Sequence, residues 1–506
     1  MTNNKLLVSV NPRYKSSTRI DGADNYKSFI DDFIIHGTAV NTLETISKTF
    51  LESSQRTFTI TGPYGSGKST LALFLSYVLS NDNKAKEYAS RKIENFTGLI
   101  KATNDLSAKN GWQAVKHVCG LESPAQGLLL SLCKGLKQPL DEQTVKLFSD
   151  ADCLNKIKNL FNKKNLKSDG LLILVDEMGK ALDYQSRTGG DLYFFQELAD
   201  LAQQSTNNIM IIGFLHQAFV EYAKNKDVLT QKEWAKVQGR YIDFGFNPSI
   251  DESLVLVGDS IVKSEGVAKS LNEMHANTVE VATKSFKAQS NNKATLLKTL
   301  PLDPIVSLLL GPISRRRFSQ NERSLFGFLA SNERYGFREF LSKYYVDDST
   351  VSQTLYEPQL LWDYLEHNLH HVIVTSNDGK GWLEACDAIQ RASQKGGPLH
   401  ANITKLVALL TIFGFQNHLH ASREFIINYL ACQKWSVDEV SKALVELESW
   451  TVLIFRQKHN ALFIFQGSDI DINSLLLETI ESLSAGVDWT DACKLYLPVL
   501  ATSHYH

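Results

Sequence analysis

The chain has 506 residues, of which 43% are hydrophobic and 21% are charged. This composition is typical of soluble globular proteins, and the length predicts about three domains. Lys and Arg number 53 against 55 Asp and Glu, which gives a net charge of −2. Bulk charge therefore favours neither nucleic acid nor an anionic membrane as a partner, and any such contact needs a local patch.

Cysteine content and apolar runs predict a cytoplasmic protein. The six cysteines are too sparse for a disulfide scaffold and no two have metal-ligand spacing, so we expect buried free thiols in a reducing compartment. Residues 1–10 are too short and too polar a stretch for a signal peptide, and no apolar run approaches the length of a membrane span. We expect no contact with a membrane.

In chain order, an N-terminal segment at 1–55 comes first. It includes an amphipathic helix at 39–51, where apolar residues recur at helical spacing. From its position ahead of the loop described next, this helix is expected to border the adenine side of a nucleotide pocket.

The most informative stretch is ITGPYGSGKST at residues 60–70. Residues 56–61 alternate apolar and polar side chains, which predicts a strand, and 71–79 have the apolar density of a helix. A strand, a Gly-rich turn and a helix form the context that the phosphate-binding pattern G-x-x-x-x-G-K-[ST] requires. We expect these residues to bind ATP: Gly62, Pro63, Tyr64, Gly65, Ser66, Gly67, Lys68, Ser69 and Thr70.

The glycines of such a loop let backbone N–H groups surround phosphate oxygens, and the helix N-terminus adds partial positive charge. Lys68 is expected to reach the β- and γ-phosphates, and Ser69 is expected to hold Mg²⁺. A loop that no longer binds nucleotide is the alternative.

Polar residues at 80–111 predict an insertion or extra helices, and 113–119 form a second candidate strand. A helix is predicted at 125–136. The Lys-rich helical insertion at 137–168 is interpreted as a solvated helix face, with a nucleic-acid contact as the alternative.

The second strong signal is a run of five apolar residues at 171–175 that ends in Asp176 and Glu177. Such a run predicts a strand buried on both faces of a parallel sheet. Asp176 is expected to hold Mg²⁺ through water and to contact the nucleotide, while Glu177 orients and deprotonates the attacking water. Glu177 as a purely structural carboxylate is the alternative.

Two further strands follow, at 209–214 and 240–246. His216 or Gln217, just after the first of them, is expected to sense the γ-phosphate or position water; a helix cap or a packed histidine is the alternative. Arg240 precedes the second strand. In a ring assembly, an arginine here points at the neighbour's nucleotide and stabilises transition-state charge; the alternative is a surface salt bridge.

Residues 250–345 read as helical and contain the densest basic cluster of the chain, at 313–323. An arginine from this cluster, with Arg316 and Arg323 as candidates, is expected to contact the nucleotide from a helical lid. A solvated face paired with acidic residues and a nucleic-acid contact are the alternatives.

Three helices at 403–413, 422–432 and 436–450, followed by strands at 452–455 and 462–465, predict a winged helix. Ser436 and Glu439 have the spacing of a capping box. The third helix carries four acidic residues against Lys442 alone, whereas a helix that enters the major groove should be basic. We therefore favour a packing or protein-contact role for it.

This order of motifs resembles the AAA+ ATPases, in the branch shared by origin-recognition-type proteins and STAND signalling ATPases, over residues 40–470. The loop GPYGSGKS and the stretch DEMGK also look loosely like large bacterial ATP-binding proteins among the antiphage-defence ATPases. The chain departs from the pattern in its insertions around 113–119 and in the absence of a readable effector motif after residue 470.

The resemblance implies an α/β, three-layer P-loop core with a five-stranded parallel sheet in the order 5-1-4-3-2, a helical lid and a winged helix. Its predicted activity is that of a Mg²⁺-dependent ATPase acting as a switch in a signalling or antiphage-defence assembly, with copies of itself or another protein as partner. A DNA-binding initiator or loader is the alternative, and a nucleotide-binding scaffold without turnover is a third. The predicted divisions are an N-terminal segment, the core, the lid region, the winged helix and a C-terminal helical segment, at 1–55, 56–250, 251–398, 399–470 and 471–506.

Overall fold

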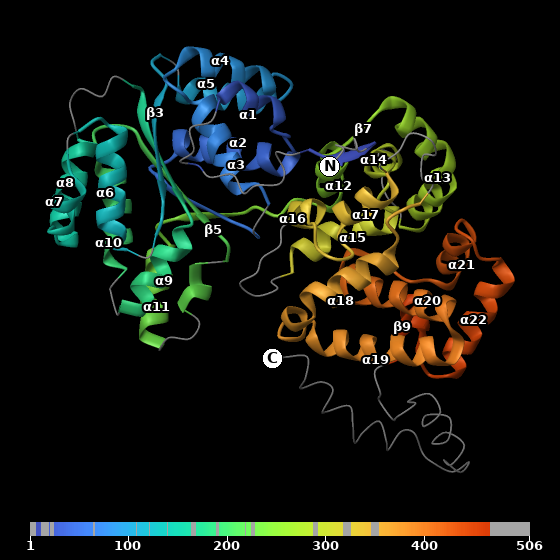
Figure 1. Cartoon of the computed structure of the whole chain (residues 1–506). Helices are drawn as coiled ribbons and strands as arrows, with labels where there is room; N and C mark the ends of the chain where they lie inside the picture. Colours follow the sequence, from blue (N-terminus) through green and yellow to red (C-terminus); the bar gives the residue numbers. More distant parts are fainter. Residues whose placement is uncertain are drawn as a thin grey trace, which may run out of the picture.

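The computed structural model describes residues 7–11, 20, 25–63, 66–107, 109–120, 122–138, 140–162, 168–188, 192–217, 219–223, 228–286, 292–316, 325–345 and 354–465. Of the residues named above, Tyr64, Gly65 and Arg323 lie outside these ranges, as does the predicted segment 471–506. Figure 1 shows two lobes: one contains a β-sheet flanked by helices, and the other is mostly helical. We call them the sheet lobe and the helical lobe.

The sheet lobe is organised around a five-stranded sheet whose strand pairs are all parallel. The strands lie in the order β3-β4-β5-β2-β6, which confirms the predicted order read from the opposite edge. Because carboxyl ends of parallel strands share one edge, the loops after β2, β4 and β5 lie along the same edge. The strands are β2 (Thr57–Thr61), β3 (Trp112–Val118), β4 (Gly170–Asp176), β5 (Ile209–Leu215) and β6 (Ile242–Gly245).

Helices cover both faces of this sheet, so the lobe has three layers. All seven residues of β4 are buried, as expected for a strand between two helical layers. Leu172 and Leu174 enter the core shared with one layer, whereas Ile173 and Val175 enter the other. The first layer consists of α1 (Tyr26–Asp32), α2 (Gly37–Glu52), α3 (Lys68–Val78), α4 (Asn83–Lys92) and α5 (Thr97–Leu106). The second consists of α6 (Pro124–Gly135), α7 (Glu142–Lys146), α8 (Asp150–Phe161), α9 (Met178–Thr188), α10 (Tyr193–Gln204) and α11 (Val228–Gln238), with a 3₁₀ turn η2 (Phe219–Ala223).

The helical lobe begins directly after β6. Its first helices are α12 (Ile250–Ser260), α13 (Glu265–Ser285), α14 (Asn292–Thr299), α15 (Pro304–Ser314), α16 (Leu325–Ala330), α17 (Phe337–Tyr344), α18 (Pro358–Val374) and α19 (Gly379–Gly396). A short antiparallel pair joins β1 (Val8–Val10) to β7 (Ile261–Lys263). The sequence does not predict this pair, since three residues are too few to show a period. Val8 and Val10 belong to the core of the helical lobe, so the N-terminal strand lies there before the chain crosses to the sheet lobe (Figure 1).

Three helices and a hairpin complete the described chain, in the predicted order. They are α20 (Pro398–Leu409), α21 (Arg423–Ala431), α22 (Val437–Ser449), β8 (Leu453–Arg456) and β9 (Ala461–Ile464), with a π turn η3 (Leu410–Gly414) and 3₁₀ turns η4 (Phe415–Asn417) and η5 (Gln457–His459). Both hydrogen bonds of the Ser436–Glu439 capping box are present, which confirms that prediction. These elements share one continuous hydrophobic core with α12 to α19.

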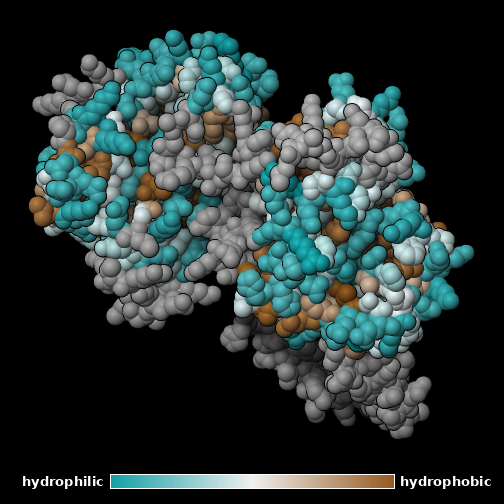
Figure 2. Space-filling view, in the orientation of Figure 1, coloured by the Kyte–Doolittle hydropathy of each residue, from teal (hydrophilic) through white to brown (hydrophobic). Residues whose placement is uncertain are grey.

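Figure 2 shows that hydrophilic side chains predominate on the described surface in that view, with apolar side chains in scattered groups. The stretch Pro398–Asn417 is long and apolar enough to cross a membrane by length and composition alone. However, 61% of its apolar window is buried inside the protein, as in a core helix. Its hydrophobicity is therefore explained by packing within the helical lobe.

A stacked tryptophan pair at the centre of the helical lobe offers a test of this core. The rings of Trp362 on α18 and Trp382 on α19 are 4.2 Å apart, and both side chains are fully buried. Replacing Trp382 with Ala should lower the free energy of unfolding by about 3–5 kcal/mol, because it removes a large buried ring and leaves a cavity. Denaturant titration followed by circular dichroism measures this. The adjacent Leu383 is 49% exposed, so Leu383→Ala should change stability by less than about 0.5 kcal/mol; equal effects would contradict the described packing.

Candidate nucleotide site

The Gly-rich loop leaves the carboxyl end of β2 and enters α3, as predicted. A Cβ atom at Gly62 would collide with the backbone carbonyl of Phe246, so the loop can pass this point only with glycine. Gly67, the N-cap of α3, has a φ of 93°, a conformation that side chains disfavour. Both glycines are therefore required by the backbone at the two ends of the loop, Gly62 after β2 and Gly67 before α3.

The Lys68 side chain folds back towards Gly62 and Pro63 at the start of the loop. Its side chain is buried, and Nζ donates hydrogen bonds to the carbonyl oxygens of Gly62 at 2.5 Å and Pro63 at 2.7 Å. The ammonium is thus held within the loop, beside the N-terminus of α3. A buried cation at a helix N-terminus, next to a Gly-rich loop, fits a phosphate-binding site.

Ser69 and Asp176, the two predicted Mg²⁺ ligands, lie together. The Ser69 hydroxyl is near enough to the Asp176 carboxylate at the end of β4 to lower its pKa, and the backbone N–H of Glu177 donates to Asp176 Oδ1 at 2.9 Å. Burial raises the pKa of Asp176, and the hydrogen bonds and the charge of Lys68 oppose that rise.

A hydroxyl and a carboxylate are oxygen donors of the kind that Mg²⁺ prefers, and Mg²⁺ takes most of its remaining ligands from water and phosphate. Within the described residues, no group of three or more His, Cys, Asp or Glu side chains has metal-binding geometry. The Ser69–Asp176 pair therefore fits Mg²⁺ bound together with a nucleotide better than a metal held by protein ligands alone.

Glu177 forms the turn between β4 and α9 with a φ of 52°. This left-handed conformation costs about 1–2 kcal/mol for a residue with a side chain. Its carboxylate is ion-paired with Lys180 on the first turn of α9. The turn is anchored beneath by Met178, whose sulfur occupies the space that a side chain at Gly213 of β5 would need. Glu177 therefore lies at the same edge of the sheet as Asp176, where a catalytic carboxylate is predicted; its role as a base stays a prediction.

His216 follows β5 directly. Burial, with smaller contributions from the charges of Lys68 and Lys180, lowers the pKa of His216 to about 3. The imidazole is therefore neutral at pH 7, and it lies within the field of both amines. This location fits the predicted role of sensing phosphate or positioning water, for which Gln217, next along the chain, stays an alternative.

Arg240 lies at the amino ends of the strands, whereas the phosphate loop lies at their carboxyl ends. Its backbone carbonyl accepts hydrogen bonds from Thr57 Oγ1 at 2.7 Å and Gln55 Nε2 at 2.8 Å, at the amino end of β2, and its guanidinium pairs with Asp200. The five residues of β2 separate these ends by about 13 Å. Arg240 is therefore directed away from the nucleotide site of its own chain, and its action on a neighbour's nucleotide stays a prediction.

The lid arginines have partners inside the helical lobe. Arg316 Nε lies 3.4 Å from Asp378 Oδ2, and Nη2 donates to the carbonyl oxygen of Ile412 at 2.8 Å. Arg315 Nη2 donates to Asn417 Oδ1 at 3.2 Å. These contacts join the end of α15 to α19 and to the turns after α20. A nucleotide contact by Arg316 stays a prediction, and one by Arg323 concerns a residue outside the described ranges.

A junction that the sequence did not predict lies beside the loop. The backbone N–H of Phe246 donates to the carbonyl oxygen of Thr61 at 2.7 Å, and the Phe246 ring lies 5.4 Å from the His36 ring at the start of α2. The chain then enters α12, whose capping-box residue is Glu252. The linker between the lobes thus touches both the phosphate loop and the N-terminus of α2.

Glu252 joins the two lobes through its carboxylate. Oε1 accepts from the Thr38 backbone N–H and Oε2 from the Thr38 hydroxyl, both at 2.6 Å, while Oε2 also accepts from the backbone N–H of Ser249 at 2.8 Å. Burial alone would raise the pKa of Glu252, but hydrogen bonds from His36, Thr38 and Ser249 hold it well below its usual range. One ionised carboxylate therefore caps the N-termini of α2 and α12 together. The spacing Ser249-x-x-Glu252 predicts the capping box of α12, but it does not predict the contact of Glu252 with α2.

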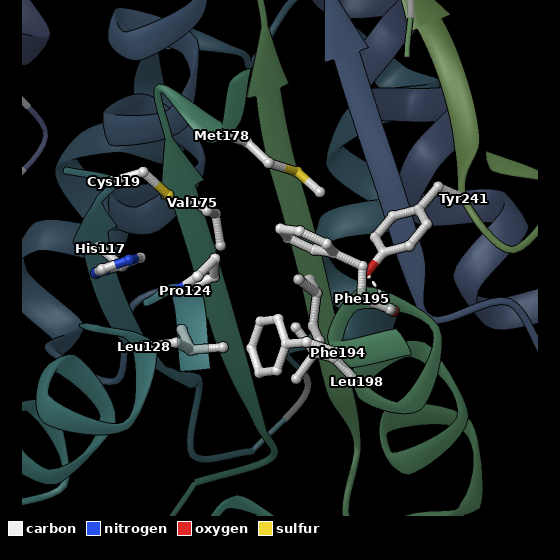
Figure 3. A pocket seen from close by; sticks show the side chains of 11 residues that line it. His117, Cys119, Pro124, Leu128, Val175, Met178, Phe194, Phe195, Leu198 and Tyr241 are labelled. Carbon is white, nitrogen blue, oxygen red and sulfur yellow. Dashed lines mark hydrogen bonds between the residues drawn. The ribbon is translucent and has the colours of Figure 1, made fainter. Parts of the chain in front are cut away.

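An apolar cavity lies on the other face of the sheet (Figure 3). It is lined by His117, Cys119, Pro124, Leu128, Val175, Met178, Phe194, Phe195, Leu198, Ile211 and Tyr241. His117 Nδ1 lies 2.9 Å from Ser131 Oγ, and the Tyr241 hydroxyl donates to the carbonyl oxygen of Phe195 at 2.9 Å. Burial lowers the pKa of His117 to about 4 and raises that of Cys119 to about 12. The wall is therefore uncharged at pH 7 and does not fit a nucleotide.

The sequence matches no protein-family model, and no curated protein matches it. Among solved structures, the chain is similar to the Aeropyrum pernix ORC2 protein in its ADP form, at 12% identity and a TM-score of 0.34, over 92% of this chain and 100% of that one. It is also similar to Drosophila ORC bound to DNA, at 13% identity and a TM-score of 0.33, over 90% of this chain and 98% of that one. With both TM-scores below 0.5, the argument for the site rests on the residues described above.

Replacing Gly62 with Ala tests the site geometry. The new Cβ would meet the Phe246 carbonyl, so the loop and the linker must separate, and nucleotide binding should fall at least about 10-fold. Equilibrium binding of a fluorescent ATP analogue measures this. Gly266, in the first turn of α13, has no atom within 4 Å of its Cβ position, so Gly266→Ala is the matched control and should leave binding unchanged. Undiminished binding by Gly62→Ala would contradict the described loop.

Proposed function

We propose that this protein is an AAA+-type P-loop ATPase that binds and hydrolyses Mg–ATP. The observation that carries the proposal is the position of Asp176 at the carboxyl end of buried β4, beside the loop that holds Lys68 and Ser69. It brings the residue after the loop lysine to the acidic end of a buried strand, with Lys68 and Glu177 beside it. The strand order of the sheet supports the same conclusion.

Each residue has a role that follows from its surroundings. Lys68 and the backbone N–H groups at the start of α3 bind the phosphates. Ser69 and Asp176 hold Mg²⁺, which neutralises charge on the phosphates. Glu177 orients the attacking water and accepts its proton, and the neutral His216 is placed to donate a hydrogen bond to phosphate or water.

The junction at Glu252 supports a switching role for the ATPase. Phe246 packs on the phosphate loop and Glu252 begins the helical lobe, so a change at the loop is transmitted to the lobe through seven residues of chain. Nucleotide binding shifts the lobes between two arrangements if it favours one of them. Assembly with a neighbouring copy that uses Arg240 is part of this proposal, and Arg240 has to leave Asp200 for that role.

Glu177→Gln tests hydrolysis. The amide cannot accept a proton, so kcat should fall by about 10²–10⁴-fold while ATP affinity is kept or increased. Lys68→Ala should instead abolish binding. A phosphate-release assay and equilibrium binding separate the two effects, and a chelator of Mg²⁺ should abolish turnover of the wild type. Equal phosphate release by wild type and Glu177→Gln would contradict hydrolysis by Glu177 and would favour a nucleotide-binding scaffold without turnover.

For the biological role, one surface favours the DNA-binding alternative. Aromatic and basic side chains from the turn after α20 and from the hairpin form a wing patch of Phe415, His418, His420, Arg456, Lys458 and His459, with the buried Phe463 beneath it. The Phe415 ring lies 4.9 to 5.3 Å from the rings of His420, His459 and Phe463, and the Arg456 guanidinium lies 4.6 Å from the Phe463 ring. Segments 410–421 and 453–465 contain no Asp or Glu.

The wing patch therefore differs from α22, the helix that would enter a major groove. Glu446 of α22 lies 2.8 Å from His400, and Glu448 pairs with Arg423, so these acids serve packing within the lobe. Basic side chains interleaved with aromatic rings suit phosphates and unstacked bases. We propose that any contact with DNA is made by the wing patch rather than by α22. A role in signalling or antiphage defence stays a prediction.

The double replacement Arg456→Ala and Lys458→Ala tests this second function. Losing two phosphate contacts should weaken DNA binding and reduce the slope of log K against log salt by about 1.8 for a duplex. Fluorescence anisotropy with a labelled duplex and a labelled single strand, at several salt concentrations, measures this. Lys442→Ala on α22 is the control and should leave both slopes unchanged. A larger effect of Lys442→Ala would assign the contact to α22, and no binding by the wild type would remove the DNA-binding role.

A further inference from the structure

Lys180 lies beside the candidate catalytic carboxylate. Its ammonium pairs with Glu177 Oε2, and its backbone N–H donates to the Glu177 carbonyl oxygen at 2.9 Å. The Lys180 side chain is 48% exposed and that of Glu177 is 31% exposed, so the ion pair faces solvent at the edge of the sheet. An exposed pair of this kind is worth less than about 1 kcal/mol, and its partners can separate readily.

The backbone beneath Lys180 has no such freedom. Met178 packs over Gly213 of β5, and a Cβ atom at Gly179 would collide with the Tyr222 side chain of η2. The first turn of α9 is therefore held on two sides. The Lys180 side chain, with its flexible four-carbon stem, can change its contact while this turn stays in place.

The sheet topology places Lys180 at the same edge as the phosphate loop, because Glu177, its partner, directly follows β4. Lys68 and Lys180 both act on His216, which follows β5 at the carboxyl edge of the sheet. Lys68 is held by the carbonyls of its own loop, whereas Lys180 is held only by a carboxylate at the surface among its described contacts. The γ-phosphate of ATP carries more negative charge than one carboxylate and competes for that ammonium.

We propose that Lys180 contacts the γ-phosphate of bound ATP, and that it leaves Glu177 to do so. This inference rests on the proposed ATPase function and deepens it. Lys180 then distinguishes ATP from ADP, because ADP offers no γ-phosphate. Once Lys180 has moved, both Glu177 oxygens are available to orient the attacking water and accept its proton. With ADP, Lys180 stays on Glu177 and covers one of them.

A purely structural ion pair would behave differently. An exposed ion pair contributes about 0.2–1 kcal/mol to stability and has no reason to distinguish two nucleotides. The ratio of ATP to ADP affinity is therefore the decisive quantity, and it is measured at equilibrium without turnover.

Lys180→Ala is the central variant, with fluorescent ATP and ADP analogues as probes. The Kd for ATP should rise about 10-fold, as for the loss of one charge-assisted hydrogen bond, while the Kd for ADP should change less than about 2-fold. Lys180→Arg, which keeps the charge, should restore most of the ATP affinity. Lys146→Ala is the matched control, because Lys146 is an exposed lysine paired with Glu142 on α7, and it should change neither Kd.

A double-mutant cycle tests the exchange of partners. Glu177→Gln removes the competitor for Lys180, so it should tighten ATP binding more in the presence of Lys180 than in the Lys180→Ala background. Equal tightening in both backgrounds would overturn the exchange, since it would reflect only the lost charge of Glu177. Equal changes in ATP and ADP affinity for Lys180→Ala, or no change in either, would also overturn the inference.

Nucleotide binding by the wild type and by Lys68→Ala distinguishes a wrong role for Lys180 from a wrong proposed function. If the wild type binds ATP, Lys68→Ala abolishes binding, and Lys180→Ala does not distinguish ATP from ADP, only the role of Lys180 is wrong. If the wild type binds neither nucleotide, or if Lys68→Ala binds both normally, the proposed ATPase function is wrong and the role of Lys180 falls with it.

Discussion

The placement of β2 between β5 and β6 in a parallel sheet is the constraint on which the site depends. It brings three loops to one edge of the sheet although they are distant in the chain: the phosphate loop after β2, Asp176 and Glu177 after β4, and His216 after β5. Ser69 and Lys68, at the start of α3, lie near enough to Asp176 to lower its pKa. The same topology puts Arg240, at the amino end of β6, on the far edge.

The charged residues at this edge lower the stability of the folded protein. Burial raises the pKa of Asp176, so its ionised form opposes folding at neutral pH, and Glu177 occupies a strained backbone conformation. Lys68 and Lys180 offset part of this negative charge. In the proposed function, Mg²⁺ and the triphosphate would add positive and negative charge where these side chains lie. A site of this kind is less stable than its surroundings before it binds and is stabilised by what it binds.

The sequence predicted the features that local patterns determine. The loop around Lys68, the buried run that ends in Asp176 and the Ser436–Glu439 capping box each follow from spacing within a few residues, whereas the strand order was implied by the resemblance to AAA+ ATPases. It did not predict contacts that join distant segments. The hydrogen bonds from Thr38 to Glu252 span 214 residues, and Arg316 meets Asp378 and Ile412 across the helical lobe. Such contacts depend on how finished elements pack, and one sequence carries no signal for that.

The carboxylate of Glu252 has a consequence for how the chain divides. Because it caps α2 as well as α12, the sheet lobe is not self-contained: part of its own helical layer is completed by a residue that belongs to the other lobe. A polypeptide that stops after β6 would keep the phosphate loop and both acidic residues but would leave the Thr38 N–H and hydroxyl, in the first turn of α2, without this acceptor. A fragment that keeps the contact between Thr38 and Glu252 therefore has to extend into α12.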